Sequence, residues 1–160
     1  MKIAVLSDIH GNLTALNSVL LDIEKEKIDH IIVLGDIITD FPRDTKQTIE
    51  TIRSVTNLVI KGNREIVING IEDGQKYKQF LTTYLTHKEL SADDFKYINS
   101  LPEQITLKFN EDIIIRCVHG SPFSPFEHIL ENENDKNNET LKSISEKILL
   151  CGHTHKQRFV

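Results

Sequence analysis

Cysteine is scarce in this chain, which has only two among its 160 residues. Two cysteines cannot form the disulfide framework on which small secreted domains depend. Cys117 and Cys151 each lie inside an apolar run, so we expect both to be buried thiols rather than a disulfide. The cysteine content therefore favours a reducing compartment, and we expect the protein to be cytoplasmic.

Long hydrophobic runs are also missing. No apolar stretch approaches the roughly 20 residues that a membrane helix needs, so no membrane partner is expected. The first residues, MKIAVLS, lack the apolar core and cleavage site of a secretory signal. Hydrophobic residues make up 39% of the chain and charged residues 27%, a balance typical of soluble globular proteins. We therefore expect one domain that spans residues 1–160.

Positive charge is not concentrated anywhere along the sequence. The formal net charge is −5, and no cluster of Lys and Arg rises above the background. Proteins that bind nucleic acid usually carry a basic patch or stripe that contacts the phosphate backbone. The charge pattern therefore argues against nucleic acid as a partner, and against a nuclease.

A strand, a polar loop and a helix recur three times in the first 65 residues. The expected strands are the apolar runs Lys2–Ser7, His30–Leu34 and Leu58–Ile60. The expected helices are one with Leu13, Leu16, Leu20 and Ile23 on one face behind an N-cap at Asn12, and one that opens at Pro42 and carries Ile49, Ile52 and Val55. This alternation is typical of parallel βαβ units, which bind ligands at the carboxyl ends of their strands.

The second half of the chain predicts more helix and a sheet that is antiparallel or mixed. The expected elements are helices at Gln75–His87, Ser91–Ser100 (N-capped by Ser91) and Leu141–Ile144, a hairpin of Ile105–Phe109 with Ile113–Val118, and a last strand at Ile148–Cys151. Between them, Glu131–Glu139 contains no apolar residue. We expect that stretch to be a solvated loop or the start of a helix, without a function.

Five short polar motifs follow the expected strands. They are Asp8-Ile9-His10, Gly35-Asp36, Gly62-Asn63-Arg64-Glu65, His119-Gly120 and Gly152-His153-Thr154-His155. Each is a weak signal alone, because an Asp after a strand is often a turn or helix cap. Together they bring carboxylates and imidazoles to strand ends that a parallel sheet gathers at one edge. These are the ligands that Zn, Mn, Fe and Ni accept, so the set predicts a metal site.

The series D-x-H…GD…GN…H…GHxH, which spans residues 3–158, resembles that of the calcineurin-like metallophosphoesterases. The opening SDIHGN and closing GHTHKQ are similar to the small bacterial and archaeal phosphodiesterase branch. The resemblance implies an α/β fold, a four-layer α/β/β/α sandwich of two mixed sheets flanked by helices. Relatives usually continue into further strands where this chain has only Lys156–Val160, so we expect a second sheet truncated at its C-terminus.

The resemblance also implies a dinuclear metal centre. One metal would be held by Asp8, His10, Asp36 and His155, and the second by Asp36, Asn63, His119 and His153, with Asp36 as the bridge. Two divalent transition metals are expected, with manganese preferred and zinc, iron or nickel as alternatives. A hydroxide between the metals would attack the phosphorus, so that no protein base is needed near pH ~7. The implied catalytic set is Asp36, Asn63, Arg64 and His119.

One position departs from the family pattern. Many relatives have a His after the Asn of the GN motif, where it donates a proton to the leaving group, but this chain has Arg64. A guanidinium with a pKa above ~12 cannot act as a general acid, although it can bind a phosphate in a bidentate manner. We therefore expect a preference for good leaving groups. The alternative is that Arg64 simply pairs with Glu65 at the surface.

Other residues receive weaker assignments. The residue that corresponds to Asn12 often contacts the phosphate or a metal ligand in relatives, and we expect Asn12 to bind substrate together with Arg64. His128, Phe123 and Phe126 follow the His119 loop and either line the substrate mouth or, for the two Phe residues, pack in the core. His30 and His87 fall outside the strand-end loops, and we expect both to be structural.

The predicted function is metal-dependent hydrolysis of a small phosphate ester, either a phosphodiester or an activated phosphomonoester. The alternative from another class is a catalytically weak or inactive metal-binding scaffold for protein–protein interaction. All seven ligand residues are present, which favours the enzyme. An unpaired strand at the edge of the second sheet could also pair with another copy, so a homodimer is a further expectation.

Overall fold

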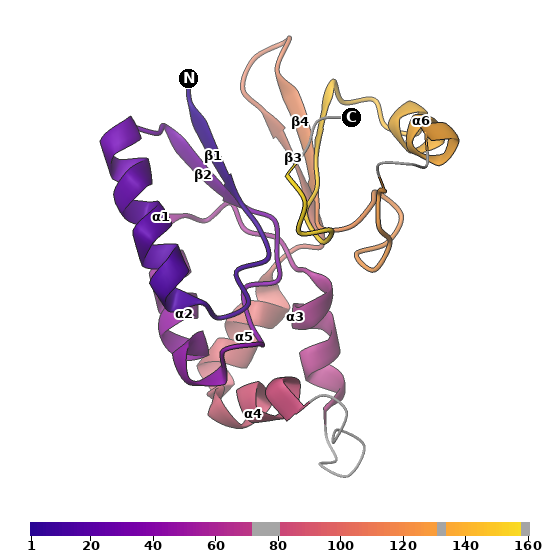
Figure 1. Ribbon diagram of the computed structural model, residues 1–160. Coiled ribbons are helices and arrows are strands. Elements are labelled where there is room, and N and C mark those ends of the chain that lie inside the picture. Colours follow the sequence, from indigo (N-terminus) through magenta and orange to yellow (C-terminus); the bar gives the residue numbers. More distant parts are fainter. Residues whose placement is uncertain (72–80, 131–133, 158–160) are drawn as a thin grey trace.

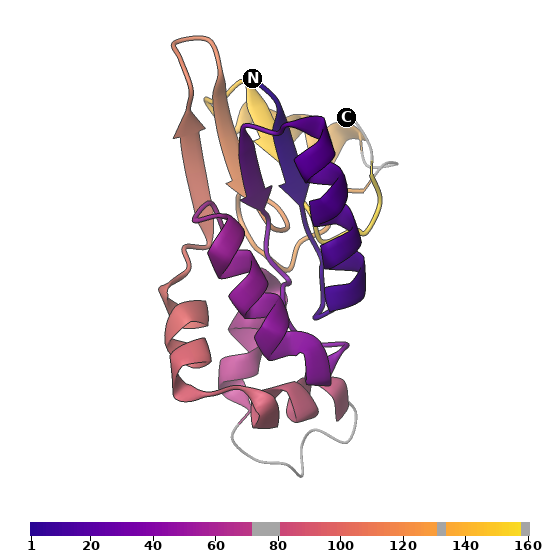
Figure 2. The same cartoon turned by 90° about the vertical axis from the view of Figure 1, so that its left-hand side faces the viewer.

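The computed structural model describes residues 1–71, 81–130 and 134–157 (Figures 1 and 2). Its strands are β1 (Ile3–Leu6), β2 (His30–Val33), β3 (Gln104–Lys108), β4 (Ile114–Val118) and β5 (Ile148–Leu150). Its α-helices are α1 (Leu13–Glu26), α2 (Thr45–Val55), α3 (Asn63–Val67), α4 (Leu81–Glu89), α5 (Ala92–Ser100) and α6 (Asn134–Lys142), with short 3-10 turns at Pro42–Asp44 and Ile68–Gly70. The chain is therefore an α/β protein, as the sequence predicts.

The first sheet consists of β1 and β2, which pair in parallel from Ile3 opposite His30 to Leu6 opposite Val33. The predicted third strand, Leu58–Ile60, is reduced to a single parallel bridge between Val33 and Val59. Two backbone hydrogen bonds join it to Val33, and the Thr56 hydroxyl adds a side-chain link by donating to the Ile31 carbonyl and accepting from the Leu58 amide.

Helices α1 and α2 cover the face of the first sheet that points away from the second sheet (Figures 1 and 2). Helix α1 begins where predicted, with the Asn12 Oδ1 accepting from the Ala15 amide at 3.0 Å. Leu16, Ile49 and Ile52 are buried beneath the two helices. Val55, predicted on the same face, is 37% exposed, because it is the last residue of α2 and no further turn covers it.

The second sheet has the order β3-β4-β5, with β3 antiparallel and β5 parallel to β4. The predicted hairpin is confirmed by the pairing of β3 and β4. Side chains from both sheets build a shared core, with Ile32 and Leu34 from the first and Ile115 and Cys117 from the second. Cys117 is buried as predicted, but Cys151 is exposed, because it follows Leu150, where the pairing of β5 ends.

The remaining helices lie outside the sheets. Helix α5 has the predicted N-cap, since Ser91 and Asp94 form a reciprocal capping box. Part of the helix predicted at Gln75–His87 lies outside the described residues, which contain α4 from Leu81 to Glu89. The helix predicted at Leu141–Ile144 is wrong in its bounds, because α6 takes in the preceding polar stretch and ends at Lys142. Among the described residues, every helix is too short or too polar to cross a bilayer.

We predict that Leu16→Ala lowers the free energy of unfolding by about 2–5 kcal/mol, because it leaves a cavity beneath α1. Leu16 is only 3% exposed. Val19, on the same helix but 41% exposed, supplies the control: Val19→Ala should change stability by less than about 0.5 kcal/mol. Urea unfolding followed by circular dichroism measures both, and equal losses would contradict the assignment of this face to the core.

Candidate metal centre

The seven predicted ligands come together where the strands end. Asp8 follows β1 and Asp36 follows β2, while His119 directly follows β4. Asn63 is the first residue of α3, and the motif that contains His153 and His155 follows β5. In Figure 1 the loops that follow these strands run below the two sheets, toward α3. Residues 145 positions apart in the sequence, such as His10 and His155, therefore become neighbours.

Two clusters of Asp and His form at this junction. The first contains Asp8, His10 and His155, and the second contains Asp36, His119 and His153. Within each cluster, the oxygen and nitrogen atoms that could bind a metal lie within 4.8 Å of one another. Asn63 joins the second cluster, because its Oδ1 lies 2.9 Å from the His119 Nε2.

Asp36 lies between the two clusters and is only 1% exposed. Its Oδ2 is 3.4 Å from the Nε2 of His119 and 3.8 Å from the Nε2 of His10. Its Oδ1 accepts a hydrogen bond from the Arg64 amide at 2.8 Å. One carboxylate oxygen is therefore fixed by the backbone, and the other faces an imidazole of each cluster.

The atoms of the first cluster have the character of a cation site. The Asp8 Oδ1 is buried and finds no hydrogen-bond donor in the part of the chain that the structure describes. It lies 3.3 Å from the His155 Nε2 and 4.0 Å from the Nε2 of both His10 and His119. The Nε2 atoms of His10 and His155 are themselves only 3.3 Å apart. Several electron-rich atoms thus lie close together, and a divalent cation bound between them would give them a positively charged partner.

The second ring nitrogen of two imidazoles is anchored, which orients the first. The Nδ1 of His119 donates to the Leu34 carbonyl at 2.7 Å, so its Nε2 is free to bind a metal when the ring is neutral. The Nδ1 of His10 lies 3.3 Å from the Thr39 Oγ1 and 3.5 Å from an Asp40 carboxylate oxygen. Thr39 and Asp40 are neighbours of His10 that the sequence did not predict.

The backbone at the centre is unusual. Five of the seven predicted ligands have positive φ angles of 51–66°, namely Asp8, His10, Asp36, His153 and His155. Such angles cost roughly 1 kcal/mol or more per residue outside glycine. They persist only where the surrounding structure imposes them, and they cluster at functional sites. The strain therefore points to the same residues as the side-chain geometry.

Arg64 and Glu65 do not form the surface pair that was considered as an alternative. Glu65 is fully buried, and its carboxylate accepts from four backbone amides. The Arg64 side chain is 33% exposed, and its Nε lies 4.0 Å from the Asp36 Oδ2. Asn12, predicted to bind substrate, uses its Oδ1 for the α1 cap, which leaves its side-chain NH2 as the group for a ligand.

A loop after His119 borders the centre. Phe123 and Phe126 are 67% and 49% exposed, so the alternative that they pack in the core is wrong. The Phe126 carbonyl lies 3.3 Å from the His153 Nε2, and the His128 ring stacks on His153 with centroids 4.1 Å apart. His30 and His87 lie elsewhere, against Phe109 and Phe95.

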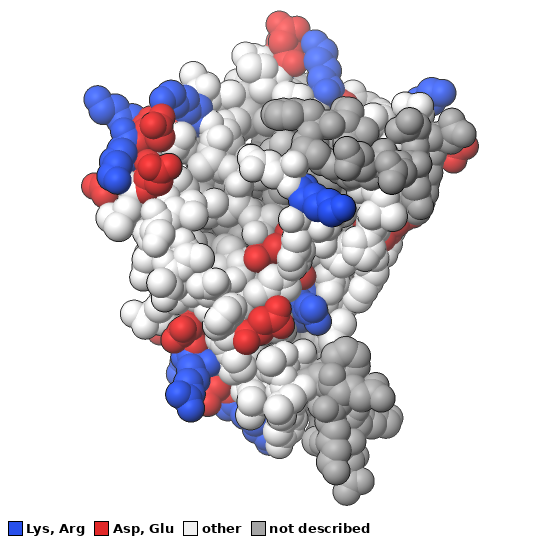
Figure 3. Space-filling model, viewed as in Figure 1, with Lys and Arg blue, Asp and Glu red and all other residues white. Residues whose placement is uncertain are grey.

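The surface around the centre is mixed in charge and hollowed on one side. On the face seen in Figure 3, the described Lys and Arg residues are interspersed with Asp and Glu.

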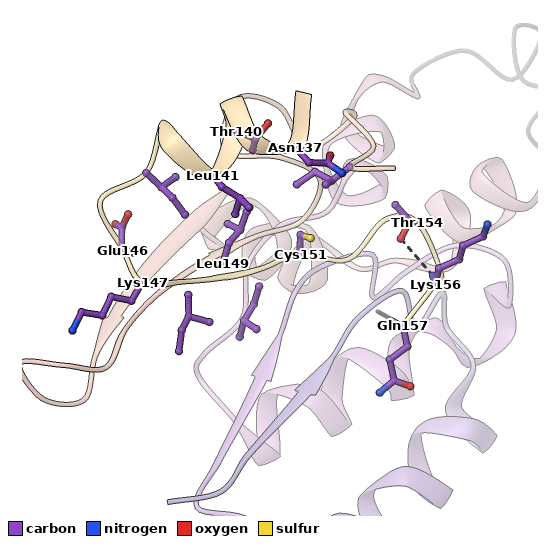
Figure 4. A pocket seen from close by; sticks show the side chains of 14 residues that line it. Asn137, Thr140, Leu141, Glu146, Lys147, Leu149, Cys151, Thr154, Lys156 and Gln157 are labelled. Carbon is purple, nitrogen blue, oxygen red and sulfur yellow. Dashed lines mark hydrogen bonds between the residues drawn. The ribbon is translucent and has the colours of Figure 1, made fainter. Parts of the chain in front are cut away.

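A hollow of about 580 Å³ lies beside β5 and α6, with Leu141, Leu149 and Cys151 among its lining residues (Figure 4). Cys151 and Thr154 also border a smaller hollow of about 410 Å³ that reaches Asp8 and His155. The larger hollow therefore adjoins the centre.

Burial and charge shift the ionisation of the central groups. Burial opposes ionisation of Asp36, but its hydrogen bond and charge interaction with His119 outweigh this, and its pKa is lowered. Burial alone would lower the pKa of His119, but its hydrogen bond and charge interaction with Asp36 raise it. Burial lowers the pKa of His10 and, together with the charges of His119 and His128, that of His153. Burial and the Asp36 charge raise the pKa of Glu65 to about 7.

We predict that in chelator-treated protein His119 titrates above the ordinary histidine value of 6.5, and His10 and His153 below it. The stabilisation from the raised His119 pKa is then fully present below pH ~6.5 and is lost as the pH rises through the folded-state value. NMR titration of the ring protons measures the three pKa values. A His119 that titrates below His153 would contradict the Asp36–His119 pairing.

The chain is similar to proteins of known family and structure. Residues 1–159 match the family described as the calcineurin-like phosphoesterase superfamily domain. A metallophosphoesterase from Sphaerobacter thermophilus superposes with a TM-score of 0.78 at 28% identity, covering 97% of this chain and 61% of that protein. The hypothetical protein PH1004 from Pyrococcus horikoshii superposes with a TM-score of 0.73 at 24% identity, covering 93% and 68%, and supports the fold alone.

An uncharacterised protein of Methanocaldococcus jannaschii, MJ0912, is 35% identical over 102 residues, which are 62% of this chain and 42% of that protein. The chain thus spans about three fifths of the Sphaerobacter protein and less than half of the Methanocaldococcus one. Because the family match extends over nearly the whole sequence, the chain belongs to the calcineurin-like phosphoesterase superfamily.

Proposed function

We propose that this protein hydrolyses small phosphate esters with the help of two divalent metal ions. The observation that carries the proposal is the position of Asp36, whose Oδ2 faces His119 of one Asp/His cluster and His10 of the other. A carboxylate oxygen has more than one lone pair, so the Asp36 Oδ2 could be shared by metals about 3.5–4 Å apart while the Oδ1 keeps its hydrogen bond to the Arg64 amide. Membership of a phosphoesterase superfamily supports the same chemistry.

We assign Asp8, His10 and His155 to the first metal and Asn63, His119 and His153 to the second, with Asp36 shared by both. The grouping agrees with the two clusters, in which the possible ligand atoms lie within 4.8 Å of each other. The nitrogen and oxygen donors suit manganese, zinc, iron or nickel, and manganese is our first choice.

A bound metal pair would supply Lewis acidity and an acidified water at neutral pH. The side chains of the protein have separate tasks. The Leu34 carbonyl accepts a hydrogen bond from the His119 Nδ1–H and so orients the ring. The Arg64 amide donates a hydrogen bond to one oxygen of Asp36. The Arg64 guanidinium, a third exposed beside Asp36, is placed to bind the phosphoryl oxygens and to stabilise their negative charge.

Arg64 also limits the leaving groups that the protein can expel. It stands where many relatives supply a proton, and a guanidinium does not release one near pH ~7. An ester whose alcohol departs readily as an anion is therefore the preferred substrate. Phe126 and His128 lie beside His153, and together with the exposed Phe123 they would line the mouth through which it enters. Asn12 would bind substrate through its amide group.

We also propose that the two sheets and their outer helices form the α/β/β/α sandwich of the superfamily. The compartment and the homodimer remain predictions. The competing function is a metal-binding scaffold for protein–protein interaction that hydrolyses no ester, and an activity assay distinguishes it from the enzyme.

We predict that the purified chain hydrolyses an aryl phosphodiester or phosphomonoester when Mn²⁺ is added, and that Asp36→Asn lowers kcat/KM by more than about 100-fold. The substitution removes the charge that would bridge the metals. Asp22→Asn, an exposed α1 position, is the control and should retain full activity. Folded wild-type protein that binds a partner protein without metal and turns over no ester would favour the scaffold.

We predict that the wild-type rate falls steeply as the pKa of the leaving group rises, because no side chain protonates the departing oxygen. Arg64→His should flatten this dependence by restoring a proton donor. Arg64→Ala should lower kcat/KM for all esters by about 10- to 100-fold, since a charge-assisted phosphate contact is lost. Rates of aryl phosphates with graded leaving groups measure the slopes, and two unchanged variants would refute the role of Arg64.

A further inference from the structure

Glu65 connects the loop that carries Asp36 to the start of α3, where Asn63 lies. Its Oε2 accepts from the Gly62 amide at 2.7 Å and from the Asp36 amide at 2.8 Å. Its Oε1 accepts from the amides of Ile37 and Ile38 at 2.9 and 3.2 Å. The residue is fully buried. One carboxylate thus binds four backbone donors, one at the start of α3 and three in the loop after β2.

This arrangement goes beyond an ordinary helix cap. A Glu at the third helical position often accepts from the N-cap amide, and Glu65 does so at Gly62. The other three amides belong to a segment about 28 positions earlier in the chain. The loops meet so closely that a Cβ on Gly62 would collide with the Asp36 carboxylate and amide. Glu65 therefore sets the distance between two proposed ligand loops.

We propose that Glu65 is a positioning residue for the metal centre: it holds the Asp36 loop against the start of α3, so that the side chains of Asp36 and Asn63 meet His119. The proposal rests on the proposed metal site. The Asp36 backbone is in the left-handed region, with φ 51°, and the hydrogen bond that its N–H donates to the Glu65 carboxylate helps to impose that conformation. Asn63 follows Gly62 directly, so the same carboxylate also fixes the start of α3.

A matched control exists in α5. Asp94 is also a buried acid at the third position of a helix, and it accepts from the Ser91 amide at 2.8 Å in the same kind of capping box. Its partners belong to its own turn and not to the ligand loops. Glu65→Gln and Asp94→Asn therefore both weaken a buried cap, but only the first should disturb the metal centre.

The test is Mn²⁺ affinity, measured by isothermal titration calorimetry on variants whose folding is checked by circular dichroism and thermal unfolding. Glu65→Gln should weaken Mn²⁺ binding by about 10- to 100-fold, as expected when a group that orients metal ligands is lost. Glu65→Asp should also weaken it, because the shorter side chain cannot reach both loops. Asp94→Asn should lower thermal stability and leave Mn²⁺ affinity unchanged.

If the Glu65 variants do not fold, amide hydrogen exchange on the wild-type protein tests the proposal instead. Added Mn²⁺ should slow exchange at the amides of Asp36, Ile37, Ile38 and Gly62, and leave the Ser91 amide as it was. Unchanged affinity in folded Glu65 variants, or unchanged protection of the four amides, would overturn the proposal. If the wild-type protein binds no Mn²⁺, Zn²⁺, Fe²⁺ or Ni²⁺ at all, the proposed function fails first, and the inference fails with it.

Discussion

The structure depends on one buried carboxylate, that of Asp36, being held between two groups of imidazoles. Burial of an ionised acid is costly unless hydrogen bonds and opposite charge compensate. Here the compensation comes from the Arg64 amide and from His119, which lowers the Asp36 pKa against the effect of burial. His119 is in turn oriented by the Leu34 carbonyl. The loop after β2 thus supplies both the acid and the anchor of its histidine partner.

Much of this arrangement follows from local signals in the sequence. Apolar runs at β1, β2 and β4 end in polar motifs, and the parallel β1–β2 pairing and the β3–β4 hairpin were predictable from them. Because strand ends collect at one edge of a sheet, the meeting of Asp8 and Asp36 was also predictable, whereas His119 follows β4 of the second sheet and reaches them through the packing of the two sheets. The Asn12 and Ser91 caps were readable for the same local reason.

Other features arise from tertiary contacts and had no local signal. The His10 neighbours Thr39 and Asp40 lie about 30 positions away along the chain. Glu65, three residues after Gly62, fits a capping box in the sequence, but its bonds to the Asp36 loop depend on the packing of two loops. The exposure of Cys151 and the single bridge at Val59 show the same limit, since an apolar run does not reveal where pairing stops.

The central claim is that Asp36 bridges two metal ions, and anomalous X-ray diffraction from crystals grown with Mn²⁺ examines it directly. The account predicts two anomalous peaks about 3.5–4 Å apart, one near Asp8, His10 and His155 and the other near Asn63, His119 and His153, with the Asp36 carboxylate between them. Peaks away from Asp36, or well-ordered crystals in which no peak forms at these residues, would contradict it.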